Sequence, residues 1–187
     1  MSSNKHSVRQ KYRWGFSLVE LLVTITISTL IASAVLVRFN AFDSVVILKT
    51  IAYEIALTLR EAQVYAVSAT GDTGGAFESP YGVHFSIANP QDYIFFEDNG
   101  NLTYDGEPTD TILETYTMNS KYQITDLCVG ASCGQSSLTA VFERPEFDAN
   151  LTPAGSAGSV VLSLVDGATI TFTVTVGSTG QISVSSP

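Results

Sequence analysis

Basic residues become scarce in this sequence once its first fifteen residues are passed. The 187-residue chain has nine lysines and arginines against eighteen acidic residues. Four of the nine lie in a leader that holds no acid, at Lys5, Arg9, Lys11 and Arg13. The rest of the chain is therefore strongly acidic, and an acidic surface repels phosphate backbones. We expect no nucleic acid among its partners.

Histidine and cysteine are equally rare, with two of each. Neither histidine, His6 or His84, lies near the cysteines of "CVGASC", so a zinc site of mixed Cys and His ligands is not favoured. In an exported chain, an even number of cysteines at short spacing favours a disulfide. We therefore predict that Cys128 and Cys133 close a small loop; two free thiols in a reducing compartment are the alternative.

Glycine and proline are absent from Phe16 to Thr70, which permits one long helix. Its first part, residues 16–37, is almost entirely apolar or hydroxyl-bearing. A helix of that length spans roughly 33 Å, enough for a bilayer core of about 30 Å. The basic leader should stay in the cytoplasm, so the C-terminal part should lie outside it.

Three kinds of processing fit this N-terminus. It is a retained anchor, or a signal peptide cut at the "ASA" of Ala32–Ala34, or a precursor cut between Gly15 and Phe16. Glu20 distinguishes these three possibilities. A carboxylate in a membrane-spanning segment costs about 2.5–3.5 kcal/mol at the centre and less near an end, so its presence calls for a partner. Only the third cut creates a partner, an α-amine about one helical turn before Glu20. The same acid also complements the helix dipole, and an acid tolerated near the membrane surface is the simplest alternative.

The stretch "GFSLVELLVTITI" resembles the processing and methylation motif of type IV prepilins and type II secretion pseudopilins. A basic leader ends at Gly15, Phe16 follows, and Glu20 is the fifth residue counted from Phe16. The resemblance implies cleavage after Gly15 by a membrane-embedded prepilin peptidase, N-methylation of Phe16, and a role for Glu20 in assembly. It implies as partners other pilin or pseudopilin subunits, the peptidase, the inner membrane and the pilus or secretion assembly platform.

Beyond Arg38 the apolar pattern narrows to one side of the helix. Apolar residues recur at spacings of three and four, at Leu48, Ile51, Ala52, Ile55, Leu59, Ala62 and Ala66. This stripe predicts a helix half packed on the globular domain, with a coiled-coil seam as the alternative, and Gly71 is a plausible stop. The segment "LREAQVYAVSATG" resembles the corresponding helix end of the H-type minor pseudopilins and related minor pilins.

From Gly82 onward the pattern has a period of two. Strands are predicted at 81–87, 92–97, 111–118, 121–127, 137–143, 159–165, 168–176 and in "QISVS" after Gly180. Asp166-Gly167 indicates a two-residue hairpin turn, and Ala154–Ser159 indicates a loop. In the strand after that turn, Ile170, Phe172, Val174 and Val176 alternate with threonines, which predicts one buried face and one wet face.

The fold class that follows is α+β, with a long N-terminal helix on an antiparallel sheet. The predicted organisation is a removed leader (1–15), a transmembrane and assembly helix (16–38), a domain-packed helix half (39–70) and a β-rich domain (71–187). The ending "ITFTVTVGSTGQISVS" is similar in shape to the last hairpin of the H-type pseudopilins.

Candidates for chemistry are few. His84 lies in a predicted strand, and the chain has neither a nucleophile elbow nor a phosphate loop. The segment "EDNGNLTYDGEPTD" (97–110) gathers oxygen ligands of the kind that Ca²⁺ prefers, at Asp98, Asn101, Asp105 and Glu107. Its spacing does not match an EF-hand, so a solvated acidic turn is the first interpretation and calcium the second. No other cofactor is indicated.

The sequence therefore predicts a structural subunit of a type IV pilus or type II secretion pseudopilus, and not an enzyme. We expect it as a single-pass protein of the inner membrane, with its C-terminal domain outside the cytoplasm, and in the assembled filament. A secreted or anchored β-rich binding domain, with a conventional signal peptide or anchor, is the alternative. It would require cleavage at Ala32–Ala34 or no cleavage.

Overall fold

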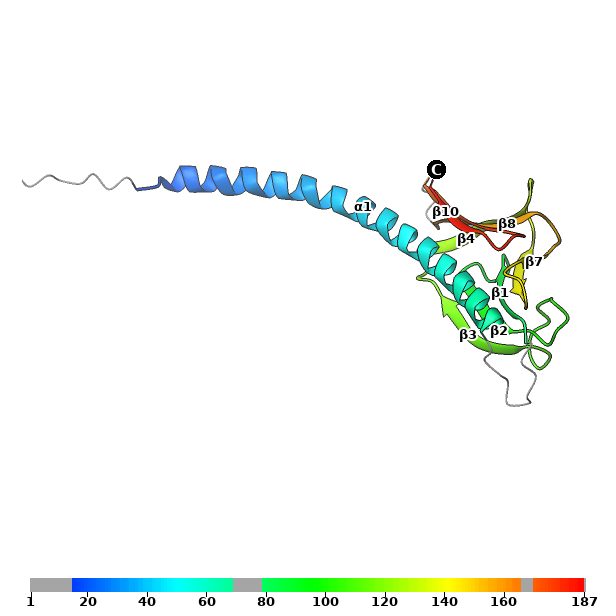
Figure 1. The fold of residues 1–187 in the computed structure, drawn as a ribbon. Coiled ribbons are helices and arrows are strands. Elements are labelled where there is room, and N and C mark those ends of the chain that lie inside the picture. The colour runs from blue at the N-terminus through cyan, green and yellow to red at the C-terminus, as the bar shows by residue number, and fades with distance from the viewer. Residues whose placement is uncertain (1–14, 69–78, 166–169, 187) are drawn as a thin grey trace, which may run out of the picture. The chain divides into compact units, whose positions relative to one another are not determined.

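A computed structural model describes residues 15–68, 79–165 and 170–186. For residues 37–43 it describes the backbone but not the side chains. In these ranges one helix, α1 (Leu18–Val67), precedes ten strands (Figure 1). The strands are β1 (Tyr81–Ser86), β2 (Asp92–Glu97), β3 (Thr111–Thr117), β4 (Tyr122–Val129), β5 (Ser132–Cys133), β6 (Ser137–Phe142), β7 (Ala149–Thr152), β8 (Ala157–Leu164), β9 (Thr171–Gly177) and β10 (Ile182–Ser185). The α+β class is thus confirmed.

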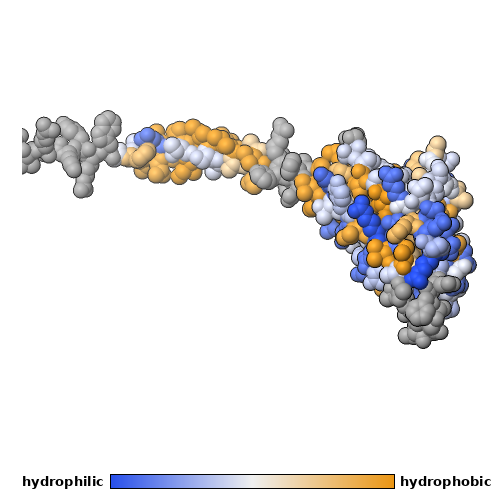
Figure 2. Space-filling view, viewed as in Figure 1, coloured by the Kyte–Doolittle hydropathy of each residue, from blue (hydrophilic) through white to orange (hydrophobic). Residues whose placement is uncertain are grey.

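The chain forms two compact units, Met1–Phe42 and Asp43–Pro187, and α1 contributes to both. In the first unit the stretch Leu18–Leu36 is long and apolar enough to cross a membrane, and none of it is buried. Figure 2 shows its surface as mostly hydrophobic. At about 1.5 Å per residue it is roughly 28 Å long, close to the thickness of a bilayer core.

The threonines of this stretch are compatible with lipid because their hydroxyls bond to the helix itself. Thr24 donates to the carbonyl of Leu21 at 2.9 Å, and Thr26 donates to that of Leu22 at 2.8 Å. Thr29 repeats the pattern with the carbonyl of Thr26 at 2.9 Å. Each hydroxyl therefore has a partner three or four residues earlier and does not need water.

In the second unit the apolar stripe of α1 is buried, as predicted. All seven of its residues lie in the hydrophobic core, and five of them, Leu48, Ala52, Ile55, Leu59 and Ala62, have no exposed surface. The core also takes in side chains from both sheets, among them Phe85 of β1 and Leu162 of β8. One face of the helix thus packs against side chains from both sheets, which answers the coiled-coil alternative for this face.

The strands form two antiparallel five-stranded sheets and not one. The first sheet has the order β3-β2-β1-β6-β7 and the second β10-β9-β8-β4-β5. Eight strands were predicted within a few residues of their bounds, whereas β5 and β7 were missed because two to four residues carry too little pattern. Ala157–Ser159, predicted as loop, begins β8, because its backbone pairs with both β4 and β9.

The predicted hairpin exists, but its register differs from the expected one. β8 and β9 pair antiparallel, with Leu162 opposite Phe172, whereas a two-residue turn at Asp166-Gly167 would place Leu162 opposite Thr171. The turn itself lies outside the described residues. Phe172, Val174 and Val176 are buried as the alternation predicted.

The C-terminal end of α1 is fastened by residues distant in sequence. Arg144 donates from its guanidinium to the carbonyl of Val67 at 3.1 Å, which satisfies one of the free carbonyls at the helix end. Gln63 donates to the carbonyl of Gly180 at 2.7 Å. A Cβ at Gly180 would lie against the carbonyl of Phe147, so only glycine permits this close approach. The predicted stop at Gly71 lies outside the described residues.

Candidate functional site

The predicted cleavage position lies just before α1. Gly15, Phe16 and Ser17 are outside the helix, which begins at Leu18. The side chain of Phe16 is 80% exposed, and among the described residues nothing lies within 4 Å of where a Cβ on Gly15 would be. A peptide bond in such non-helical, open backbone is in the form that a protease can bind. The leader, residues 1–14, lies outside the described residues.

Glu20 occupies the first turn of α1. Ser17 directly precedes the helix, and the backbone N–H of Leu21 donates to the carbonyl of Ser17 at 3.1 Å. Ser17 and Glu20 thus stand at the N-cap and at the third helical position, the spacing of a capping box. Sequence reasoning missed Ser17, although the pattern Ser-x-x-Glu before an apolar run was available to find it. Glu20 also lies where a carboxylate complements the helix dipole.

The acidic loop between β2 and β3 is built around two buried carboxylates. Asp98 is 3% exposed, and one oxygen accepts from the backbone N–H of Gly100 at 2.7 Å and of Leu102 at 3.0 Å. Asp110 is equally buried and accepts from the backbone N–H of Asn99 and of Asp105. Carboxylates that accept several backbone N–H groups order a loop without a metal ion.

The four calcium candidates are only partly brought together. Asn101 donates from its side-chain amide to Asp105 at 2.5 Å, and Glu107 is exposed. Among the described residues, one group of three Asp, Glu, His or Cys residues has ligand atoms that all lie within 4.8 Å of one another. This group consists of Asp126, Cys128 and Cys133, and it is not in this loop. Of the oxygens of Asp98, Oδ1 is buried and has no hydrogen-bond partner in the described structure. Calcium binding by this loop stays a prediction.

The same loop covers the outer face of the first sheet through Tyr104. Its ring stacks on His84 with centroids 4.2 Å apart and meets Phe96 edge-on at 4.9 Å. His84 and Phe96 alternate with the core-facing residues of β1 and β2, yet Phe96 has no exposed surface. Gly82 permits this packing, because a Cβ there would lie 2.9 Å from the Phe96 ring.

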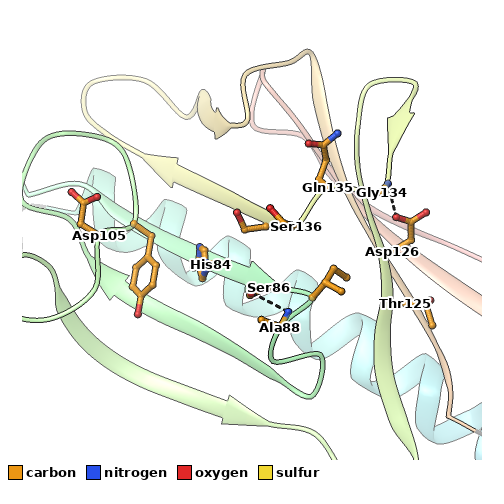
Figure 3. A pocket seen from close by; sticks show the side chains of 12 residues that line it. His84, Ser86, Ala88, Asp105, Thr125, Asp126, Gly134, Gln135 and Ser136 are labelled. Atoms are coloured by element: carbon orange, nitrogen blue, oxygen red, sulfur yellow. Dashed lines mark hydrogen bonds between the residues drawn. The ribbon is translucent and has the colours of Figure 1, made fainter.

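An open groove of about 660 Å³ lies beside Tyr104 (Figure 3). It is lined by polar groups from four segments, which include His84, Ser86, Asp105, Asp126, Gln135 and Ser136. The Nδ1 of His84 lies 2.8 Å from the hydroxyl of Thr139. Burial lowers the pKa of His84 from 6.5 to about 4, so the imidazole is neutral at pH 7. The groove can therefore offer hydrogen bonds and two carboxylates to a polar molecule.

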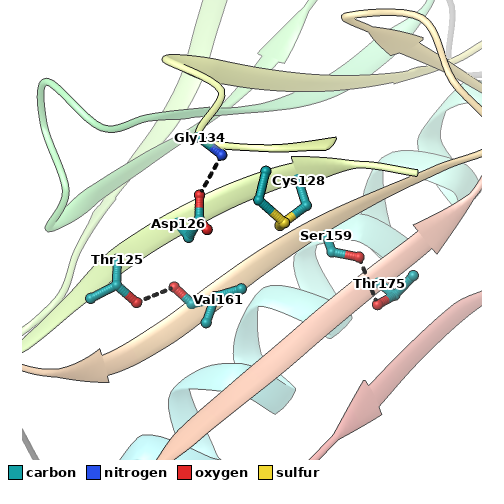
Figure 4. The surroundings of a disulfide bond; sticks show 8 residues. Thr125, Asp126, Cys128, Gly134, Ser159, Val161 and Thr175 are labelled. Carbon is teal, nitrogen blue, oxygen red and sulfur yellow. Dashed lines mark hydrogen bonds between the residues drawn. A yellow bond between two sulfur atoms is a disulfide. The ribbon is translucent and has the colours of Figure 1, made fainter. Parts of the chain in front are cut away.

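The predicted disulfide is present (Figure 4). Cys128 and Cys133 are paired across β4 and β5, which are themselves joined by the short turn that the bond closes. Asp126 lies next to them and accepts from the backbone N–H of Gly134 at 2.8 Å. Asp126, Cys128 and Cys133 are the potential metal-binding group mentioned above. The two cysteine sulfurs are bonded to each other, so neither is a thiolate that could bind a metal. The bond therefore serves to hold β5 on the edge of the second sheet.

No family model, no curated protein and no solved structure matches this chain.

Proposed function

We propose that this protein is a structural subunit of a type IV pilus or type II secretion pseudopilus. It is inserted in the inner membrane, processed after Gly15 by a prepilin peptidase, and assembled through packing of its N-terminal helix. The observation that carries the proposal is the pairing of an accessible Gly15-Phe16 bond with an apolar helix that has Glu20 in its first turn. Within this class, a minor subunit similar to the H-type pseudopilins is the specific proposal.

Energetic reasoning supports a helix that packs against other helices after processing. A carboxylate near the end of a membrane span raises the free energy of insertion, and a simple membrane anchor does not require one. Cleavage would place the new α-amine of Phe16 within about one turn of Glu20, in the same chain or in a neighbouring one. A subunit inserted at the wrong height would then leave a charge unpaired, so Glu20 would define the register of assembly.

A secreted domain with a conventional signal peptide is less well supported. Its cleavage site, Ala32–Ala34, lies within the continuous helix Leu18–Val67. The Gly15-Phe16 bond, in contrast, is already outside the helix. The groove beside Tyr104 would suit a ligand-binding domain, but it does not explain Glu20.

The test is the N-terminal sequence and intact mass of the protein isolated from its own host. We expect a chain that begins at Phe16 with one added methyl group. A chain that begins at Val35 would replace the proposal with a secreted domain. An unprocessed Met1 in a host that has the peptidase would also contradict it.

The role of Glu20 is tested by two variants that separate charge from capping. Glu20→Gln keeps a side chain that can complete the capping box but removes the charge, whereas Glu20→Ala removes both. We expect both variants to insert in the membrane and both to assemble poorly, because the charge is what defines register. Normal filaments with Glu20→Gln and few with Glu20→Ala would show that Glu20 acts only as a helix cap.

A further inference from the structure

The groove beside Tyr104 continues into a second hollow on the outer face of the first sheet. The two hollows share His84, Ser86 and Tyr104. The second has a volume of about 260 Å³ and is also lined by Asn89, Asp92, Ile94 and Thr115. Its floor is a row across three strands, because His84 pairs with Ile94 and Ile94 pairs with Thr115. We call the two hollows together the long groove.

The long groove carries negative charge that no basic residue balances. Its three carboxylates come from separate segments, Asp92 from β2, Asp105 from the loop between β2 and β3, and Asp126 from β4. Among the residues that the structure describes, the lining of both hollows contains no lysine or arginine. His84 adds no positive charge at pH 7, because burial lowers its pKa to about 4. The long groove therefore attracts cations and repels anions.

The positions of the carboxylates favour an organic cation over a metal ion. Figure 3 shows Asp105 and Asp126 on opposite sides of the first hollow, with His84 between them. In the described ranges these carboxylates do not converge, because Asp126 is grouped only with the two bonded cysteines. Ca²⁺ would need about six to eight oxygens around one point. A ligand with several charges along an apolar chain matches this spacing better.

We propose that the long groove binds a linear polyamine, with ammonium groups at the three carboxylates and methylene groups across Tyr104. An ammonium group forms strong, charge-assisted hydrogen bonds with a carboxylate, and a cation near the face of a tyrosine ring is attracted to it. Ile94 in the floor of the second hollow offers a further apolar contact for the methylene chain.

The groups that would contact the polyamine are already held in place. The ring of Tyr104 is fixed between His84 and Phe96, as described above. One oxygen of Asp126 accepts from the backbone of Gly134, and one oxygen of Asp105 accepts from Asn101. In each carboxylate the other oxygen is left for a ligand. Binding therefore requires little ordering of the protein, which lowers its entropic cost.

A polyamine suits this floor better than a basic peptide does. An extended peptide binds a sheet through backbone hydrogen bonds to a free edge strand. The floor of the long groove lies on β1 and β2, which are interior strands of the first sheet and have neighbours on both sides. A polyamine has no backbone amides to satisfy. This inference concerns the β domain alone, so it does not depend on cleavage after Gly15 or on assembly.

The experiment measures binding of spermidine to the full-length chain by isothermal titration calorimetry. A zwitterionic detergent keeps anionic lipids from competing for the ligand. We expect a dissociation constant of about 100 µM or lower. Asp105→Asn and Asp126→Asn keep an oxygen for their present hydrogen bonds and should each weaken binding about tenfold. Asp148→Asn removes the same charge from an exposed residue outside the long groove and should change binding less than about twofold.

The contribution of the ring is measured by two variants of Tyr104. Tyr104→Phe keeps the ring and should bind spermidine about as well as the natural chain, whereas Tyr104→Leu should bind about fivefold more weakly. Thermal unfolding of both variants shows whether the β domain is intact. Equal binding by two folded variants would overturn the contact between the ligand and the ring.

The other outcomes also decide the matter. No binding at about 10 mM spermidine would overturn the inference. Equal weakening by Asp105→Asn, Asp126→Asn and Asp148→Asn would do the same, since it would reflect diffuse attraction to an acidic domain. Tighter binding of a triarginine peptide than of spermidine would assign the long groove to a basic peptide. Displacement of spermidine by an equal concentration of Ca²⁺ would assign it to a metal ion.

Discussion

The two parts of α1 use similar side chains in opposite ways. From Leu18 to Leu36 every side chain is exposed, on all sides of the helix. From Leu48 to Ala66 a single stripe of side chains is buried in the core of the β domain. A helix that is apolar all round needs an apolar environment from outside the chain, whereas an amphipathic one can find it within the chain. The second part of α1 finds that environment in the β domain, whereas the first part is long and apolar enough to find it in a bilayer.

The largest effect should come from the buried stripe. Leu59→Ala removes a side chain with no exposed surface and should lower the free energy of unfolding of the β domain by about 4 kcal/mol, because it leaves a cavity. Leu57→Ala, 65% exposed in the same helix, should change it by less than about 0.5 kcal/mol. Chemical unfolding in detergent measures both. If both variants lowered the free energy of unfolding by similar amounts, the faces of α1 that carry Leu59 and Leu57 would not differ in burial.

A charge in the first part should act on membrane insertion and not on the domain. Ile27→Asp places a carboxylate near the middle of the span, at a cost of about 3 kcal/mol, and should strongly reduce the fraction of membrane-integrated chain. Leu57→Asp has comparable initial exposure and should leave insertion unchanged. Extraction of membranes with alkaline carbonate distinguishes integrated from peripheral protein. Unchanged insertion of the Ile27 variant would mean that this stretch does not span the bilayer.

Loss of the disulfide should affect only the β domain. Cys128→Ser/Cys133→Ser opens a loop of sequence separation 5 and should lower the free energy of unfolding by about 2 kcal/mol, since the unfolded chain regains freedom. A reductant should produce the same loss in the natural chain and none in the variant. Insertion of the span should not change. A reductant effect in the variant would assign the loss to something other than this bond.

The smallest expected effect is a pH dependence that belongs to the β domain alone. The pKa of His84 falls from 6.5 to about 4 on folding, so between these values the unfolded chain binds a proton that the folded chain does not. Stability from this group is therefore complete above pH 6.5 and decreases as the pH falls toward 4. Allowing for its partial exposure, we expect a loss of about 1–2 kcal/mol.

His84→Gln should remove this part of the pH profile while the loss that carboxylates cause at lower pH remains. Thermal unfolding between pH 4 and 7 compares the two proteins. Parallel profiles would show that His84 is protonated as easily in the folded chain as in the unfolded one.

Much of this architecture was predictable because it depends on periodicity. The buried stripe of α1 and the alternation of Phe172, Val174 and Val176 follow from spacings of 3.6 and two residues, which are local properties of the chain. The disulfide was predictable from cysteine count and spacing. The division into two sheets was not, because it depends on which strands pair, and Leu162 facing Phe172 depends on a turn whose length local propensity does not determine.

The functional features can likewise be divided into those that follow from the sequence and those that depend on tertiary contacts. The sequence by itself determined the apolar span, the position of Glu20 and the opposite signs of the leader and the domain, because all of these depend on residue order alone. Only the tertiary structure decided that Tyr104 covers His84 and that Asp98 and Asp110 order their loop by accepting backbone N–H groups. Such outcomes arise from contacts between segments far apart in sequence, and local sequence patterns do not reveal which surface another segment will reach.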